Sequence, residues 1–555
     1  MPQGLGFNAH GLLQEMTDKE SLAVKSDATV LETAVPLSQS VIWRLQSDYY
    51  TQRGLKAWTE DQVPSYITNN PFIAEIYAAI VTGFLEDCLR QPPAGSPPLS
   101  PENPLRILEL GAGTGKFSYL FLHKLMPLLR EKNIAPEIVR YLMTDCAESL
   151  IAQWRGNSYL AEFSAAGILE FELLQAGEKN AFQFFGAKGS QLAKPAKAPL
   201  VVIANYVFDS LPQDAFVISD GKISEALLTV SNGGRTESQA QSLSGLQLSF
   251  TNAAVPPQRY KDPAWNAILE EYRTSLPAAT VFFPSAALAL LQQLSRSSDG
   301  RMLVLAADKG LAHEEELALT PGPPVLEFHS SRRCFSLMVN FDAISRYFAA
   351  TGGISLVPPK HSTSLNICAF LQRRPQDEFS ETSKAHRQAV TAFGVDDLFA
   401  VMSWLNPHLE SVSVGQALSL LRLTRWDPTA FLRLFPVIAP KLRNIAAERH
   451  DLRNAVLSVW ENRYPVEPGD NALAFSCGVV LLELRFHAEA AAMFKASEQL
   501  LGRTAATSYN LGLCVLGLEH RAEALAHMTE ACRLDPAFEP ARATRARLEN
   551  ETKPG

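Results

Sequence analysis

The chain has 555 residues, of which 46% are hydrophobic and 19% are charged, and its formal net charge is −8. This length is too great for one hydrophobic core, so at least two domains are expected. The acidic balance argues against a general nucleic-acid binder, which needs a basic face, and leaves a local basic groove open. The seven cysteines form no C-x-x-C pair, which argues against a disulfide framework or a metal site. No apolar run approaches the ~18–20 residues that span a bilayer, and the N-terminus lacks the layout of a secretory signal. We therefore expect a soluble cytoplasmic protein.

The first hundred residues carry little strand pattern. Residues 1–40 are polar and rich in small side chains, and we expect a flexible tail. Apolar residues then recur with helical spacing in 40–58 and more strongly in 70–91. Six prolines in 91–104 exclude regular structure and indicate a linker. Residues 41–104 are therefore expected to form a helical segment that ends in this linker.

From residue 105 to residue 372, short apolar runs alternate with helical stretches. The runs that we expect to be strands are "RILEL", "IVRYLMTD", "GILEFELL", "PLVVIAN", "RMLVLAAD", "GGISLVPP" and "SLNICAFLQRR". Continuous apolar strands separated by helices are typical of a parallel sheet covered on both faces. The segment is therefore predicted to be one α/β domain.

The remaining chain is predicted to be helical. Residues 373–388 are charged and nearly free of apolar side chains, so we expect a second linker before a helical domain at 389–555. Gly512 and Ala524 repeat the positions of Gly478 and Ala490, 34 residues later. With Ala531 and Pro536, these residues fit the small-residue and helix-stop positions of tetratricopeptide repeats, clearest in 471–537; an unrelated helical bundle is the alternative, and 389–465 is not assigned to the repeats.

The first predicted strand ends in Glu109 and runs into three glycines, Gly111, Gly113 and Gly115. Glycines in such a turn let the backbone approach a ligand closely. A phosphate loop of the Walker type needs wider spacing and a hydroxyl after its lysine, and neither is present. A dinucleotide site prefers a third glycine where Lys116 stands. The remaining fit is the S-adenosylmethionine site of a class I methyltransferase, and a purely structural turn is the alternative.

Two later segments place polar residues where strands end. Asp145 ends the second strand, where an acid can accept hydrogen bonds from both ribose hydroxyls. Asn205 and Asp209 follow the fourth strand, at the mouth of an otherwise apolar run. We expect Asp209 to orient or deprotonate a methyl acceptor, with Asn205 and Tyr206 as hydrogen-bonding neighbours. The alternative for Asp209 is a helix cap.

Four blocks in order give the sequence a resemblance to a known family. They are "PSYITNNPFIAEIYAAIV", "ILELGAGTG", "YLMTDCAESLIAQW" and "NYVFDSLP", followed by a weaker fifth, "MVNFDAISRYFAATGG". Together they resemble the MidA-like S-adenosylmethionine-dependent methyltransferases, which include the mitochondrial complex I assembly methyltransferase. The likeness covers about residues 41–372. It implies a Rossmann-like class I domain that uses S-adenosyl-L-methionine.

The resemblance also carries site residues onto this chain. The residues expected to bind the cofactor are Glu109, Gly111, Ala112, Gly113, Gly115, Asp145, Cys146 and Asn205. Tyr66 and Thr68, from the N-terminal block, are expected to close over the cofactor or the acceptor. Asp209, Asn205 and Tyr206 are the catalytic candidates. His329 and His361 lie late in the domain and are expected to be structural.

Two departures from the family pattern bear on the acceptor. Asp145 stands where the family usually has Glu, and this acid can still accept hydrogen bonds from ribose hydroxyls. Tyr206 stands where the family has a Glu, so a carboxylate that could bind a guanidinium is missing. We expect a protein or peptide acceptor held with help of the helical repeats. A small-molecule methyltransferase and a non-catalytic assembly factor are the alternatives.

Overall fold

The computed structural model describes residues 29–60, 66–92, 97–176, 182–186, 198–232, 243–329, 333–359, 361–362, 365–465 and 472–551. The chain divides into two compact units. The first comprises Met1–Asn69 and Ile73–Asp397, and the second comprises Asn70–Phe72 and Leu398–Gly555. Within the described residues, no helix is both long and apolar enough to cross a membrane.

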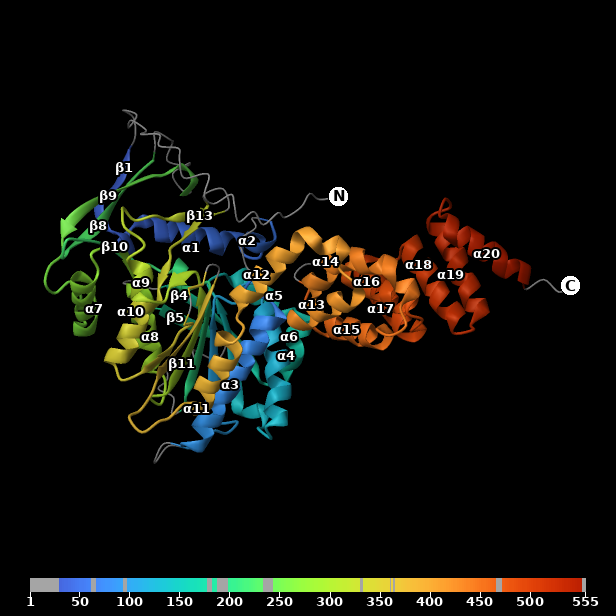
Figure 1. Ribbon diagram of the computed structural model, residues 1–555, viewed down its shortest axis with the longest axis horizontal. Coiled ribbons are helices and arrows are strands. Elements are labelled where there is room, and N and C mark those ends of the chain that lie inside the picture. The colour runs from blue at the N-terminus through green and yellow to red at the C-terminus, as the bar shows by residue number, and fades with distance from the viewer. Residues whose placement is uncertain are drawn as a thin grey trace. The chain divides into compact units, whose positions relative to one another are not determined.

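The first unit is built on an eight-stranded sheet (Figure 1). Across the sheet the strands are β16 (Ile354–Leu356), β17 (Asn366–Gln372), β11 (Met302–Asp308), β6 (Leu200–Asn205), β2 (Leu105–Leu110), β3 (Val139–Asp145), β4 (Leu169–Ala176) and β5 (Phe182–Gly186). The five strands from β11 to β4 are parallel, whereas β17 runs against both of its neighbours and β5 runs against β4. The seven strands predicted from apolar runs are all present.

Helices cover both faces of this sheet, as continuous apolar strands require. The covering helices are α3 (Pro71–Arg90), α4 (Lys116–Glu131), α7 (Pro263–Ser275), α8 (Ser285–Ser295) and α10 (Phe341–Ala350). One face carries Leu108 and Val304, which belong to a core shared with α7, α8 and α10. On the other face Tyr141 contacts Phe121 of α4, with ring centroids 5.4 Å apart. The central strands are therefore buried on both sides.

A second, antiparallel sheet was not expected from the sequence. Its strands are β1 (Val30–Pro36), β8 (Lys222–Ser231), β7 (Asp214–Ser219) and β10 (Ala278–Phe283), with β9 (Gln247–Ala254) paired to β8. The predicted flexible tail at 1–40 is therefore wrong for Val30–Pro36, because this segment pairs with β8. Residues 1–28 lie outside the described part. The isolated bridge between Ser100 and Asn103 interrupts the predicted linker at 91–104, of which 93–96 are not described.

The predicted linker at 373–388 is also wrong, because α11 (Ser380–His386) lies within it. Asp87 of α3, which is 1% exposed, supplies the reason. Its carboxylate accepts hydrogen bonds from the backbone of Glu381 at 3.2 Å and of Thr382 at 2.8 Å, and from the Thr382 hydroxyl at 2.8 Å. A partner distant in sequence thus satisfies the first N–H groups of a helix that has few apolar residues.

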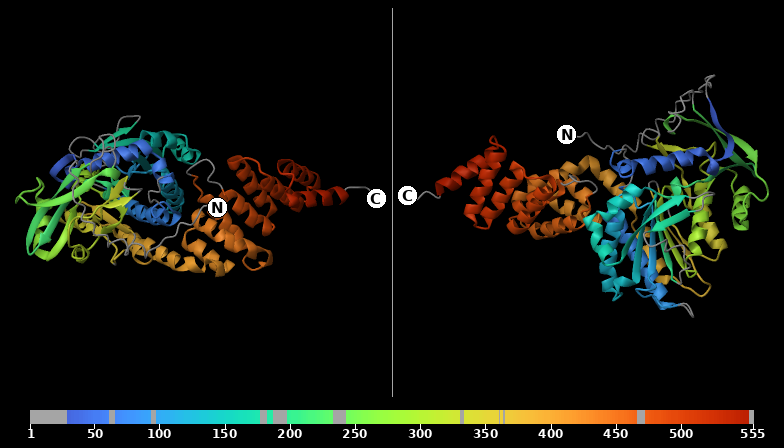
Figure 2. Two further views of the ribbon diagram at one scale, coloured as in Figure 1. Left: turned by 90° about the horizontal axis from the view of Figure 1, so that it is seen from above. Right: turned by 180° about the vertical axis from the view of Figure 1, so that it is seen from behind.

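The second unit is helical throughout its described residues (Figure 2). Its helices are α12 (Val395–Leu405), α13 (Val414–Leu423), α14 (Pro428–Ile438), α15 (Arg449–Glu461), α16 (Ala472–Glu483), α17 (His487–Leu501), α18 (Ala505–Gly517), α19 (Arg521–Leu534) and α20 (Glu539–Glu551); α12 begins in the first unit. The pairs α16–α17 and α18–α19 are hairpins. Gly478 packs against Phe494 in the first hairpin, and Gly512 packs against Met528 in the second.

We expect Gly478→Ala to destabilise the helical unit. A Cβ atom at Gly478 would lie 2.8 Å from the Phe494 ring, so the α16–α17 pair must open slightly. Overpacking of this kind costs about 1–3 kcal/mol. The matched control is Gly415→Ala in α13, where the nearest atom to the new Cβ is 4.0 Å away. The control should gain up to about 1 kcal/mol in the free energy of unfolding. Urea denaturation of both variants measures the difference, and equal effects would contradict the close packing at Gly478.

Candidate active site

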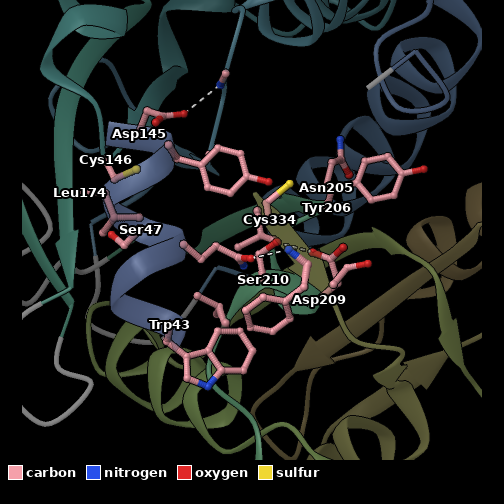
Figure 3. Close-up of a pocket in the computed structure, with 18 of the residues that line it drawn as sticks. Trp43, Ser47, Asp145, Cys146, Leu174, Asn205, Tyr206, Asp209, Ser210 and Cys334 are labelled. Carbon is pink, nitrogen blue, oxygen red and sulfur yellow. Dashed lines mark hydrogen bonds between the residues drawn. The ribbon is translucent and has the colours of Figure 1, made fainter. Parts of the chain in front are cut away.

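A cavity of about 950 Å³ lies at the carboxyl ends of β2, β3 and β6. The chain passes from β2 to β3 and β4 on one side and returns to β6 and β11 on the other, so β2 and β6 flank the point where the strand order reverses. Ligands of open α/β sheets bind in the crevice at this point. Figure 3 shows Asp145 and Cys146 at one end of the drawn site and Trp43 at the other, with Asp209 and Ser210 between them and Asn205 and Tyr206 to one side.

The glycine turn after β2 forms the floor of one part of the cavity. Gly111, Gly113 and Gly115 have φ angles of 63°, 54° and 78°, in the left-handed region that glycine adopts without strain. The backbone N–H of Ala112 donates to the carbonyl of Thr144 at 2.9 Å, which fixes the turn to the end of β3. A Cβ atom at Gly113 would lie 3.3 Å from the Trp58 ring. The turn thus brings bare backbone against the cavity.

Glu109, the next-to-last residue of β2, is buried beside this turn. Its carboxylate accepts hydrogen bonds from the Ser118 hydroxyl and, at 2.8 Å, from the Tyr141 hydroxyl. Burial raises the pKa of Glu109 to about 7, although both hydrogen bonds act to lower it. A positively charged ligand group would favour the ionised form. Glu109 is therefore suited to a cation more than to a phosphate.

Asp145 joins the end of β3 to the glycine turn. One carboxylate oxygen accepts the Gly113 N–H at 3.0 Å and the other accepts the Ala147 N–H at 3.3 Å (Figure 3). Trp154 donates its indole N–H to the Gly113 carbonyl at 3.0 Å. Burial raises the pKa of Asp145, against the lowering effect of the backbone hydrogen bonds. These bonds hold the carboxylate in one orientation at the cavity wall.

Asn205 and Tyr206 follow β6 on the neighbouring wall. The Asn205 Oδ1 atom accepts a hydrogen bond from the Tyr77 hydroxyl of α3 at 2.7 Å. Tyr206 has a φ angle of 52°, which is uncommon for a residue with a side chain, and its N–H donates to the Ala307 carbonyl at 2.9 Å. This conformation lets the chain turn sharply from β6 toward Asp209.

Asp209 lies in the short helix η6 (Phe208–Ser210) and is 7% exposed. Its carboxylate accepts a hydrogen bond from the Ser210 hydroxyl at 3.0 Å. Burial is the largest influence on its pKa and raises it to about 7; nearby Glu327 also raises it, whereas Lys309 lowers it. A carboxyl group with a pKa near neutrality can accept a proton and release it again. Asp209 and Glu109 are thus two carboxyl groups of the cavity whose pKa values are raised to about 7.

A further wall comes from segments in which the sequence had singled out only His329. It consists of α1 (Val41–Arg53) and the hairpin of β13 (Glu327–His329) and β14 (Cys334–Ser336). Gln46 accepts the Phe335 N–H at 2.8 Å, and the rings of Trp43 and Phe335 are 4.8 Å apart. Helical spacing predicted α1, but it gave no sign that Trp43 and Gln46 face a cavity. Phe335, in the hairpin that contacts α1, lies almost 290 residues after Gln46 in the sequence.

Most of the residues expected in the site line this cavity. They are Thr68, Glu109, Gly111, Ala112, Gly113, Asp145, Cys146, Asn205, Tyr206 and Asp209. Two do not line it: Gly115 is the N-cap residue of α4, and Tyr66 lies outside the wall. His329 does line the cavity, whereas His361 is largely exposed and pairs with Glu316 at 2.6 Å. The roles of these residues stay predictions.

Residues 95–341 match the model of a protein family described as "Putative S-adenosyl-L-methionine-dependent methyltransferase". The match covers less than half of the chain, but it includes all the strand ends that surround the cavity. These residues are therefore an S-adenosylmethionine-dependent methyltransferase domain. The protein is an enzyme that uses S-adenosyl-L-methionine as its cofactor.

Solved structures with low identity are also similar to the chain. An uncharacterized superfamily protein from Burkholderia thailandensis is 13% identical, with a TM-score of 0.39 over 63% of this chain and 90% of that chain. A protein of the same superfamily and organism, bound to S-adenosyl-homocysteine, is 14% identical, with a TM-score of 0.36 over 73% and 84%. The plantazolicin methyltransferase in complex with the same product is 12% identical, with a TM-score of 0.25 over 60% and 100%. No curated protein matches. The assignment rests on the family match, because likenesses this weak support no function.

Proposed function

We propose that this protein is a class I, MidA-like methyltransferase that methylates a protein or peptide, with the helical unit helping to hold the acceptor. The order β4-β3-β2-β6-β11-β17-β16, in which β17 is reversed, supports the Rossmann-like class. The observation that carries the proposal is one cavity with Glu109 and Asp145 beside a glycine turn and Asp209 on another wall. It offers a place for a cationic nucleoside and a separate group for proton transfer.

The cavity residues fit S-adenosylmethionine by their chemistry. Two carboxylates favour a ligand that carries ammonium and sulfonium charges, and the bare backbone at Gly113 allows close approach. When bound, the cofactor supplies a methyl group on a positively charged sulfur. Asp145 would hold the ribose hydroxyls and Glu109 would face the amino-acid part. The volume of about 950 Å³ is at the upper end of the range of small-molecule sites, so it leaves room for an acceptor group.

The protein's part in the transfer is alignment and proton removal. An N–H or O–H acceptor must lose a proton, and Asp209 would accept it directly or through a water molecule. Asn205, fixed by Tyr77, and Tyr206 would orient the acceptor beside Asp209. The buried surroundings of Asp209 limit competing contacts with water. Alignment of this kind can supply several kcal/mol of the barrier reduction.

We expect the affinity for S-adenosylhomocysteine to rise with pH through about 7. Glu109 has a pKa of about 7 in the free protein, and only its ionised form attracts the ligand's ammonium group. Asp145, whose pKa is also raised, acts in the same direction. Glu109→Gln should weaken binding about tenfold at pH 8 and flatten the profile. Calorimetric titration measures this, with Glu131→Gln at the end of α4 as a control. An unchanged profile in Glu109→Gln would place the ammonium group elsewhere.

A groove on the helical unit supports the acceptor part of the proposal. It is open, measures about 470 Å³, and is lined by Lys495, Glu498, Gln499, Arg503, Leu511 and His527. The residues come from α17, α18, α19 and the α17–α18 turn. Paired hairpins with glycine contacts 34 residues apart support a tetratricopeptide-like array, whose concave surfaces commonly bind peptides.

No disulfide joins the seven cysteines, all in described positions, which supports the proposed cytoplasmic location.

The proposal is tested by incubating the full-length protein with labelled S-adenosylmethionine and cell lysate. We expect label in protein, and less label with Lys495→Glu, which reverses a groove charge. The control Arg547→Glu on α20 makes the same change of charge outside the groove and should have no effect. Label only in small molecules would support the small-molecule alternative. Absence of cofactor binding would leave the non-catalytic assembly factor.

A further inference from the structure

His329 ends β13 and lies in the cavity wall that the hairpin of β13 and β14 forms. It pairs with Cys334 across the hairpin, and Ser336 lies two residues further along β14, so these three side chains share one face. All three line the cavity. From the sequence we expected His329 to be structural, but its place in the wall brings its imidazole within reach of a ligand.

The protein holds this imidazole through one of its two ring nitrogens. The Nε2 atom of His329 lies 2.9 Å from the hydroxyl oxygen of Ser336, which is a hydrogen-bond distance. Within the described residues the Nδ1 atom has no hydrogen-bond partner, and it is not sealed from solvent. One ring nitrogen is therefore fixed by the protein, and the other is accessible to a ligand.

The hairpin is also bonded to the segment that carries Asp209. The backbone N–H of Leu337, the residue that follows Ser336, donates to the Asp209 carbonyl at 3.2 Å. The Lys309 ammonium group pairs with Glu327 of the same hairpin at 2.9 Å. Since Lys309, Asp209 and Ser336 all line the cavity, the histidine belongs to the wall in which Asp209 lies.

The charges around His329 favour its neutral form. Burial lowers the pKa of the imidazole most, and Lys309 lowers it further, whereas Glu327 raises it. The ordinary pKa of histidine is about 6.5, so the ring is neutral at pH 7. A neutral imidazole has one nitrogen that donates and one that accepts. It can bond to Ser336 with one nitrogen and to an uncharged polar group with the other.

We propose that His329 is a specificity-determining residue that contacts the methyl acceptor. Ser336 is a positioning residue, because it holds Nε2 and so leaves Nδ1 for the acceptor. The acceptor then has two polar features near each other: the N–H or O–H group that loses its proton to Asp209, and a hydrogen-bonding group that meets His329. A peptide amide beside the methylated group supplies the second feature, since it has both an N–H and a carbonyl. The inference rests on the proposed function, in which Asp209 faces the acceptor.

The first test compares His329→Phe with the parent protein. Phenylalanine keeps a planar ring and removes both nitrogens. The measurement is transfer of label from S-adenosylmethionine to the protein fraction of cell lysate, with KM expressed as the lysate protein concentration at half-maximal rate. We expect KM to rise about tenfold, while kcat and the affinity for S-adenosylhomocysteine change little. The control His361→Phe, at an exposed position outside the cavity, should behave as the parent does.

Two outcomes of this test are distinct. An active parent with the same KM in His329→Phe would overturn the inference and leave the proposed function standing. A parent that transfers no label to lysate protein would overturn both. If His329→Phe does not fold, as judged by urea denaturation, His329→Ala takes its place.

The second test asks whether Ser336 acts through His329. Ser336→Ala should raise KM about threefold to tenfold, and Ser336→Thr, which keeps the hydroxyl, should restore it. In the His329→Phe background, Ser336→Ala should add nothing, because the hydroxyl has lost its partner. NMR of protein labelled with nitrogen-15 in histidine identifies the His329 ring by its missing signals in His329→Phe, and Ser336→Ala should shift those signals. Additive effects on KM, or unshifted ring signals, would show that the serine does not position the imidazole.

Discussion

Replacing Gly113 by valine is expected to lower the affinity for S-adenosylhomocysteine by about a hundredfold or more. The residue has a φ angle of 54°, which a β-branched side chain adopts only with strain, and a new Cβ would lie 3.3 Å from the Trp58 ring. Relief of either problem moves the backbone that should contact the cofactor. A loss of about 3 kcal/mol in binding corresponds to two powers of ten. Calorimetric titration of the purified variant measures it.

The matched control for this variant is Gly352→Val, in the turn between α10 and β16. Gly352 also has a positive φ angle, 79°, but a Cβ atom there would meet nothing within 4 Å. It therefore reproduces the backbone strain without touching the cavity. The control should lose some stability and keep its affinity for S-adenosylhomocysteine. Equal affinity in Gly113→Val and the parent protein would show that the glycine turn is only structural.

Asp209→Asn is expected to reduce methyl transfer by about 10²–10⁴, the usual contribution of a general base. Cofactor affinity should change little, because Asp209 lies apart from Asp145 in the drawn site (Figure 3). In the parent protein, kcat/KM should rise with pH up to about 7 and then level off. The sign follows from the role: only the ionised carboxyl accepts a proton, and its pKa is about 7. The variant should lack this rising limb.

Asp220→Asn is a suitable control for this experiment. It removes the same charge in the exposed turn between β7 and β8, and we expect its pH profile to match that of the parent protein. The pH profiles of the parent protein, Asp209→Asn and Asp220→Asn are measured as radiolabel transfer to the acceptor fraction from pH 5.5 to pH 9. A profile for Asp209→Asn that keeps the rising limb would assign the proton transfer to another group. Unchanged transfer would leave Asp209 as a structural residue of the turn.

The main sheet could be read from the sequence because its strands are buried on both faces. The run Leu200–Asn205 is almost continuously apolar, Leu105–Leu110 is buried at every residue, and helical patterns separate such runs. The antiparallel sheet gave no such signal. Its strands β8 and β9 largely alternate between more and less buried residues, and β1 is mostly exposed. One local sign was present: Asp220 and Gly221, both with positive φ angles, form the two-residue turn between β7 and β8.

The sequence predicted the site residues that lie at strand ends. It did not predict those that reach the cavity through contacts between segments far apart in the chain. Glu109, Asp145 and Asn205 lie at or next to the carboxyl ends of parallel strands that are neighbours in the sheet, so their meeting follows from the order of the strands. Gln46 reaches the cavity only because Phe335 pairs with it from far along the chain.

The wall formed by α1 affects the choice of boundaries for a fragment of this enzyme. The family match begins at residue 95 and ends at residue 341. A protein cut at those borders would keep the glycine turn, Asp145 and Asp209. It would lose Trp43, Gln46 and Thr68 from one side of the cavity, and β17, which covers the edge of β11, from the other. The cavity of such a fragment would lack part of its wall and would be open to water. Its failure to bind a ligand would therefore say nothing about the intact enzyme.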